Sequence, residues 1–231
     1  MRQAMVRVLD LGVRRLTVAE ALPYAQGESL RLARAVAEVE PATIALDLSL
    51  ADLLRVREAL ADKHARNRGF VDEVLLEARR ERFPCEEVHP FLETVRYARA
   101  RDVTVVPLLE DAKEPGPFTR RRLAGEIRHF LEAADAQSKD PREFARAFDD
   151  ALRGVPRFAS DSAAVEADAA RRLADLLFKA QSPRLVAVLS YPRSERLLAK
   201  LMTLRPKTLN EPAVEEVAAI DSRPRRSEVP P

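Results

Sequence analysis

Apolar positions along this chain follow two patterns, short continuous runs and longer stretches with a helical period. The continuous runs cover residues 5–12, 42–47, 103–109 and 184–189. Each is short, rich in Val, Ile or Leu and bounded by polar residues, which predicts a buried strand. Amphipathic stretches with apolar residues three and four positions apart separate the runs. Strands that alternate with helices predict an α/β fold, with a mainly parallel sheet flanked by helices.

Changes in pattern also predict the domain organisation. Residues 1–204 read as one α/β domain, and residues 119–160 within it form a helical insertion without strand character. Residues 205–231 are rich in proline and hold only scattered apolar positions. Such a segment cannot bury enough apolar surface to offset the entropy of ordering, so we expect a flexible tail.

Composition narrows the class of protein. The chain has 231 residues, of which 46% are hydrophobic, so it is large enough and apolar enough to bury a core. Its formal net charge is only +2, so its overall electrostatic field does not favour binding to nucleic acid or to an anionic membrane. No run of about 18 apolar residues could span a bilayer. The first residues lack a signal-peptide pattern, which predicts a cytoplasmic protein. A single cysteine, Cys85, excludes an internal disulfide and a cysteine-based metal cluster.

Common catalytic motifs are missing from the sequence. Gly12 stands alone, so there is no glycine-rich phosphate loop, and Ser190 lacks the flanking glycines of a nucleophile elbow. Glu-x-x-His occurs at residues 86–89 and 126–129, a spacing used in dimetal sites. Prolines on both sides of the first pair argue against the regular helix that such a site needs. We therefore predict neither a metal nor a cofactor.

Charged residues gather where the predicted strands end. In parallel sheets, ligands bind outside the carboxyl ends of the strands, so side chains there can converge in one crevice. We predict a crevice for a small anion, formed by Arg15, Asp47, Glu110 and Arg193. A second interpretation stays open, in which these charges pair with each other and only complete the sheet edge. The full set at these positions is Arg14, Arg15, Asp47, Glu110, Asp111 and Arg193.

Four segments resemble, in their order along the chain, the motifs of the TraB/PrgY-like family, which is related to Tiki metalloproteases and to ChaN-like and erythromycin-esterase-like proteins. They are residues 12–15, 40–47, 103–111 and 186–193. In that family an opening strand runs into Gly-x-x-His, a second strand ends in Glu, a third leads to an acidic-basic loop, and the last carries another Gly-x-x-His. Residues 166–168, before the last strand, fall where the family carries an acidic and basic cluster.

The departures from these motifs are chemically important. Arg15 and Arg193 stand at the two histidine positions, and Asp47 stands near the glutamate position. The resemblance implies metal ligation through those histidines, whereas Arg stays protonated and cannot ligate a metal. The chain is thus expected to be a degenerate TraB-like member without metalloprotease activity, a pseudoenzyme candidate whose site binds an anion.

Two other functions fit the same residues. Mg²⁺ and Mn²⁺ accept all-oxygen ligands, so Asp47, Glu110 and Asp111 could serve a carboxylate-based divalent-metal hydrolase. Alternatively the protein is a scaffold that docks a protein partner through the tail and the basic triplet at residues 120–122. Long apolar helix stripes also allow a homo-oligomer.

Overall fold

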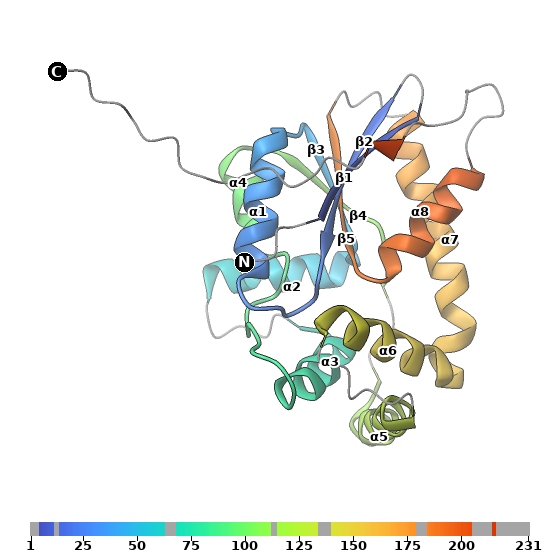
Figure 1. Cartoon of the computed structure of the whole chain (residues 1–231). Helices are drawn as coiled ribbons and strands as arrows, with labels where there is room; N and C mark the ends of the chain where they lie inside the picture. Colours follow the sequence, from blue (N-terminus) through green and yellow to red (C-terminus); the bar gives the residue numbers. More distant parts are fainter. Residues whose placement is uncertain are drawn as a thin grey trace.

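The computed structural model describes residues 5–11, 14–62, 68–111, 115–133, 140–178, 184–204 and 214–215. Within these ranges a mostly parallel sheet lies between helices, which confirms the predicted α/β fold (Figure 1). The strands are β1 (Met5–Asp10), β2 (Arg15–Ala21), β3 (Thr43–Leu46), β4 (Thr104–Pro107), β5 (Leu185–Ser190) and β6 (Val214–Glu215). The helices are α1 (Glu28–Val39), α2 (Leu50–Ala61), α3 (Phe70–Arg80), α4 (Leu92–Ala100), α5 (Pro117–Ala133), α6 (Pro141–Gly154), α7 (Pro156–Phe178) and α8 (Arg193–Thr203).

The sheet has the strand order β4-β3-β5-β2-β1-β6. Strands β4, β3, β5 and β2 are parallel, whereas β1 and β6 run antiparallel to their neighbours. Alternation along β5 divides its side chains between the two faces: Leu185, Ala187 and Leu189 pack on one side, and Val186 and Val188 on the other. The strand is buried on both faces, which explains its continuous apolar run.

The first predicted strand differs from the structure in an important way. The chain does not leave the sheet after residues 5–12 but turns back, and β1 and β2 form an antiparallel hairpin in which Asp10 lies opposite Arg15. It is β2 that pairs in parallel with β5. The segment Leu16–Ala21 hides this strand from the sequence pattern because alanine and glutamate, which are depleted in strands, interrupt its apolar positions.

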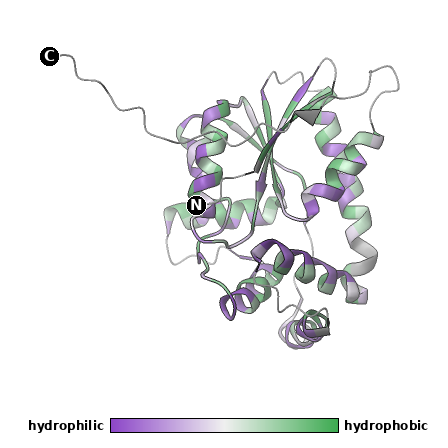
Figure 2. Ribbon diagram, in the orientation of Figure 1, coloured by the Kyte–Doolittle hydropathy of each residue, from purple (hydrophilic) through white to green (hydrophobic). Residues whose placement is uncertain are grey.

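Helices cover the two faces of the sheet with separate apolar cores. Buried residues of α1, α2 and α4 pack against one face, and those of α7 and α8 against the other. Figure 1 shows these two groups on opposite sides of the strands. Figure 2 shows green along the strands and mixed colours on the helices, as expected for amphipathic elements around a buried sheet.

A third core lies beyond the carboxyl ends of the parallel strands. Helices α3, α5 and α6 bury their apolar faces against one another there, together with Tyr24 from the turn after β2. In Figure 1 these helices lie below the sheet. Between β4 and β5 the described residues form the helices α5, α6 and α7 and no strand. This helical layer covers the edge of the sheet where the sequence predicts a site.

Two helix starts match their sequence signals. The Ser49 side chain accepts a hydrogen bond from the Asp52 backbone N–H at 3.2 Å, and Asp140 caps α6 with Pro141 in its first turn. Two residues of the segment predicted to be flexible, Val214 and Glu215, form β6 beside β1. The rest of that segment lies outside the described residues. No helix in the described ranges is long and apolar enough to cross a membrane.

Candidate functional site

A cavity of about 520 Å³ lies between the sheet edge and the helical layer. Its sheet side is formed by the residues that follow β3, β4 and β5, and its opposite side by α3, α6 and the first turns of α7. Small-molecule sites in proteins have volumes of roughly 300–1,000 Å³ and occur at this edge of α/β sheets. The predicted location of the site therefore coincides with a cavity of ligand size.

Asp47 and Arg193 meet at the sheet side of this cavity. Arg193 Nη1 donates to Asp47 Oδ1 at 3.0 Å, and the Ser190 backbone N–H donates to Asp47 Oδ2 at 3.1 Å. The Asp47 side chain is fully buried. Its negative charge raises the pKa of the Arg193 guanidinium above the ordinary value. The two residues predicted to bind a ligand thus lie together, but they largely satisfy each other.

Glu110 lies at the solvent margin of the cavity, beyond the end of β4. Its side chain is 62% exposed and pairs with Arg172 of α7, with Arg172 Nη2 and Glu110 Oε1 2.8 Å apart. The neighbouring Asp111 accepts a hydrogen bond from the Ala51 backbone N–H at 2.8 Å. Both acidic residues lie at the predicted edge, and each is held by a different element rather than turned toward Asp47.

Arg15 does not belong to this site. It is the first residue of β2, and the next residue, Leu16, lies opposite Leu185, the first residue of β5. Because β2 and β5 are parallel, Arg15 lies at the amino edge of the sheet, whereas Arg193 follows the carboxyl end of β5. At about 3.3 Å per residue, the length of β5 alone separates the two edges by roughly 17 Å. The hairpin is the physical reason for the error, since it reverses the chain before Arg15.

A second charged cluster closes the cavity near α7. Glu166 is buried and binds Arg153, whose guanidinium also contacts Asp149, and Arg196, whose Nε lies 2.8 Å from Glu166 Oε1. Lys200 Nζ lies 3.2 Å from the other Glu166 oxygen. Burial alone would raise the pKa of Glu166, but the hydrogen bond and charge of Arg196 outweigh it and hold the pKa below its ordinary value. This cluster ties α6, α7 and α8 together.

Arg79 of α3 is different, because it is buried without a matching carboxylate. Its side chain is 1% exposed, and Nε and Nη1 have no hydrogen-bond partner. The guanidinium stacks 5.3 Å from the centre of the Phe83 ring and interacts with the Cys85 thiol. Burial lowers the pKa of Arg79, and the closest carboxylate that acts on it, Glu28, is already bound to Arg31. Arg79 lines the cavity with an uncompensated charge.

Asp72 lines the cavity two turns earlier on the same helix. Burial, assisted by the negative charge of Asp52, raises the pKa of Asp72 to about 6. The buried Tyr24 hydroxyl lies close to this carboxylate and interacts with it. Burial and the Asp72 charge raise the pKa of Tyr24 well above its ordinary value. Tyr24 is therefore a neutral hydroxyl beside a carboxylate.

His89 also borders the cavity, although it precedes α4 and follows no strand. Its side chain is 2% exposed, and burial, together with the charge of Arg68, lowers its pKa to about 3. His89 Nδ1 accepts the Phe91 backbone N–H at 3.2 Å, so the neutral ring carries its proton on Nε2. It presents a neutral imidazole at neutral pH.

Neither Glu-x-x-His pair forms a metal site. Glu86 and His89 lie in a non-helical segment, and Glu86 Oε2 accepts the Ser29 backbone N–H at 3.3 Å instead of facing His89. His129 lies on the exposed side of α5, where its ring packs on Phe130. Across the ranges that the structure describes, no group of three or more His, Cys, Asp or Glu side chains is arranged to hold a metal ion.

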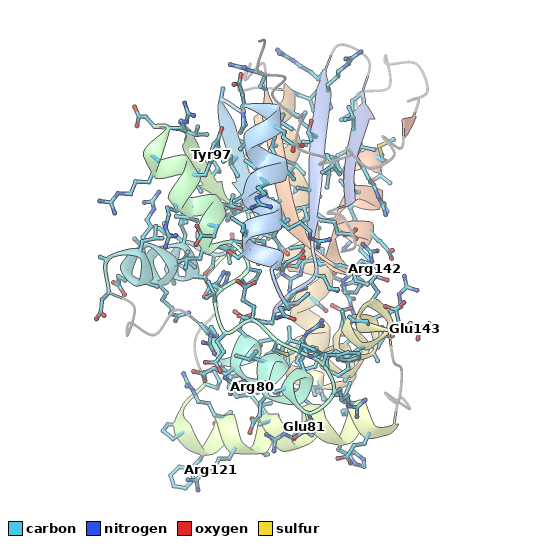
Figure 3. The ribbon with its side chains drawn as sticks, turned by 60° about the vertical axis from the view of Figure 1, so that its left-hand side comes forward. Arg80, Glu81, Tyr97, Arg121, Arg142 and Glu143 are labelled. Carbon is cyan, nitrogen blue, oxygen red and sulfur yellow. The ribbon has the colours of Figure 1, made fainter. Side chains whose placement is uncertain are left out.

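The three arginines of the basic triplet at residues 120–122 lie in different environments. Arg120 donates from Nε to the Pro115 carbonyl at 2.9 Å and stacks over Phe70. Arg122 Nε lies 3.3 Å from Glu126 Oε1. Arg121 points outward from α5, away from the neighbouring helices (Figure 3). The triplet does not act as one patch.

No protein-family model matches this chain, and no curated protein matches it. The interpretation of the site depends on its own geometry.

Arg79 and the Tyr24 hydroxyl, both at or next to the cavity, were absent from the set predicted from the sequence. One signal was present for Arg79: it falls on the apolar face of α3, four residues after Leu75 and three after Leu76, both of which are buried. A charged residue within an apolar helix stripe indicates a buried charge. For Tyr24 no local pattern exists, because its burial depends on α3 and on the segment around His89.

Proposed function

We propose that this protein binds a small organic anion in the cavity between the sheet edge and the helical layer, with Arg79 as the anion contact. The observation that carries the proposal is the burial of the Arg79 guanidinium without a hydrogen-bond partner for two of its nitrogens. A buried charge costs several kcal/mol unless it is paired. A fold that retains such a charge beside a cavity of ligand size fits a site completed by its ligand.

The walls of the cavity indicate an organic rather than an inorganic anion. They include Leu75, Phe91 and Phe148, side chains that offer apolar contact but no hydrogen bonds. A guanidinium recognises carboxylate and phosphate groups through paired hydrogen bonds. Because Nε and Nη1 are covered in the free protein, we expect the Arg79 side chain to turn toward the ligand when it binds.

The cavity modifies the site expected from the sequence. We still propose anion binding at the carboxyl edge of the sheet, but the residue that contacts the anion is Arg79 rather than Arg15 and Arg193. The kinship to TraB-like proteins, a cytoplasmic location and docking of a partner through the C-terminal segment stay predictions. A carboxylate-based metal hydrolase is less well supported, since Asp47, Glu110 and Asp111 are each bound to separate groups.

Thermal-shift and calorimetric titrations test the proposal, with acetate, benzoate, caproate and inorganic phosphate as probes. We expect an organic carboxylate to raise the melting temperature of the wild-type protein and to lose this effect in Arg79→Met. Arg79→Lys keeps the charge without the planar fork, so it should retain weakened binding.

Arg80→Met is the matched control, because Arg80 lies on the same helix, is exposed and pairs with Glu87 at the surface (Figure 3). It should respond to the anions like the wild type. Equal stabilisation of Arg79→Met and wild type by every probe, or no stabilisation of either, would contradict the proposal.

A further inference from the structure

We infer that the ligand is an elongated zwitterion, an ω-amino carboxylate or a molecule of similar charge distribution, held with its carboxylate at Arg79 and its ammonium group at Asp72. The inference rests on the proposed function, because it takes Arg79 as the anion contact and adds a second, oppositely charged contact on the same helix.

The geometry of α3 places the two contacts on one face. Asp72 and Arg79 are seven residues apart, which is close to two full turns, and both line the cavity. Their Cα atoms are separated by about 10.5 Å along a regular helix. In the free protein the Arg79 guanidinium lies over Phe83, on the side away from Asp72, so the turn toward the ligand proposed above is what would bring the two charged groups to face the same ligand. A ligand with its charges at opposite ends fits this arrangement.

The charges near each contact have opposite sign. The charged groups that act on Asp72 are Asp52 and Arg193, which line the same cavity. Asp47 pairs with Arg193 and Asp52 with Arg55, which leaves Asp72 without an ion-pair partner among the described residues. Arg79 is the converse, a guanidinium without a paired carboxylate.

One neutral group, the Tyr24 hydroxyl, interacts with Asp72, while the charge of Arg68 acts on Tyr24 and on His89. The Tyr24 hydroxyl and the neutral His89 ring pack edge to face, with 6.3 Å between their ring centres. With a pKa of about 6, Asp72 is mainly ionised at neutral pH. An ammonium group would satisfy the carboxylate. Tyr24 does not line the cavity itself but interacts with Asp72 through its hydroxyl, so it is a positioning residue for Asp72.

Apolar residues between the two charged contacts suit a hydrocarbon spacer. Leu75 lies between Asp72 and Arg79 on α3, and Phe91 and Phe148 line the same cavity. Methylene groups placed there are removed from water, at a gain of about 0.8 kcal/mol for each buried group. Chain length should therefore affect affinity through both burial and the distance between the charges.

Isothermal titration of the full chain with a matched ligand set tests the inference. The set is glycine, γ-aminobutyrate, ε-aminocaproate and ω-aminocaprylate, with caproate and hexylamine as analogues that lack one charge. We expect ε-aminocaproate or ω-aminocaprylate to bind at least about tenfold more tightly than caproate, the gain typical of one charged hydrogen bond. Glycine is too short to reach both contacts.

Asp72→Asn should abolish the preference for the amino acid over caproate while caproate still binds. Glu77→Gln is its control, because it removes the same charge from an exposed site on α3, where Glu77 pairs with Arg128. The preference should also fall below pH 6 as Asp72 takes up a proton beside Asp52, Tyr24 and Arg193, the groups that act on it from α2, the β2–α1 turn and α8.

The outcomes separate this inference from the proposed function. If caproate and ε-aminocaproate bind equally well to the wild type, the proposed anion site is retained and the inference of a zwitterionic ligand is wrong. Equal binding of hexylamine and ε-aminocaproate would also overturn the inference, since it removes the need for Arg79. If no member of the set binds, both proposals fail.

Discussion

The two ends of the cavity treat charge in opposite ways. Asp47 at the sheet edge is enclosed by Arg193 and a backbone N–H, and Glu166 on α7 is enclosed by three cations. On α3, Arg79 is buried and Asp72 is half-buried, and neither has an ion-pair partner in the described ranges. Asp72 does interact with the Tyr24 hydroxyl and the Gly69 backbone. The charges of Asp47 and Glu166 are thus paired within the chain, whereas those of Arg79 and Asp72 are not.

This difference separates structural charges from candidate binding charges. A satisfied buried pair holds elements together and offers little to a ligand, because binding would first have to break it. An unsatisfied charge lowers the stability of the free protein and can be compensated by binding. Position at a strand end, which guided the sequence prediction, does not distinguish these two cases.

The largest change in stability is expected from removal of the buried ion pair between Asp47 and Arg193. Asp47→Ala removes the only ion-pair partner that the described residues give Arg193 and leaves the Ser190 N–H without its acceptor. We expect it to lower the free energy of unfolding by about 3–5 kcal/mol. Urea denaturation measures this loss, and Arg193→Met added to Asp47→Ala should recover part of it. A loss below about 1 kcal/mol would show that the pair is not structural.

Lowering the pH should destabilise the folded protein, because His89 is neutral in the folded chain and takes up a proton more readily in the unfolded chain. Its pKa is about 3 in the folded chain and 6.5 in model peptides, so between these values the unfolded state binds the extra proton. Stability contributed by His89 is complete above pH 6.5 and is lost as the pH falls toward 3, by about 3 kcal/mol at pH 4. His89→Asn keeps an acceptor for the Phe91 N–H without titrating. Denaturation at pH 7 and pH 4 should show a smaller loss in this variant, and equal losses would contradict the assignment.

Arg79→Met should raise the free energy of unfolding, whereas Asp47→Ala should lower it. Methionine fills a similar volume without a charge, so we expect the free protein to gain about 1–2 kcal/mol while it loses anion binding. Thermal or urea unfolding in the absence of ligand measures the gain. Arg80→Met, at an exposed pair, should change little. If Arg79→Met destabilises the free protein as strongly as Asp47→Ala, the comparison between the two ends fails.

The smallest effects are expected at two residues predicted from the sequence. Glu110→Gln disturbs an exposed pair and Arg15→Gln an exposed side chain at the amino edge, and each should change stability by less than about 0.5 kcal/mol. Titration with caproate should give wild-type affinity for both. A tenfold weaker affinity in Arg15→Gln would show that this residue reaches the ligand.

The fold was predictable from the sequence where local patterns determine it. Continuous apolar runs marked β3, β4 and β5, helical periods marked the helices, and Ser49 and Asp140 marked two helix starts. The β1–β2 hairpin was not predictable from the sequence, because β2 contains alanine and glutamate and its strand character depends on pairing with β1 and β5.

The candidate site was predictable in place but not in composition. Asp47, Glu110 and Arg193 followed from their positions after strands. Arg79 lines the cavity, and Tyr24 meets Asp72 behind it, only because the helical layer folds over the sheet edge, which involves residues far apart in the sequence. Whether a charge has a partner likewise depends on tertiary contacts.

The late position of β5 has a consequence for biosynthesis. This strand lies between β2 and β3, so it alone joins the β1–β2 pair to the β3–β4 pair, yet it comes after α7 along the chain. While the ribosome is still making the first four-fifths of the polypeptide, the nascent chain holds two unconnected strand pairs with exposed edges. Truncation before Leu185 should therefore give an aggregation-prone fragment rather than a smaller folded protein.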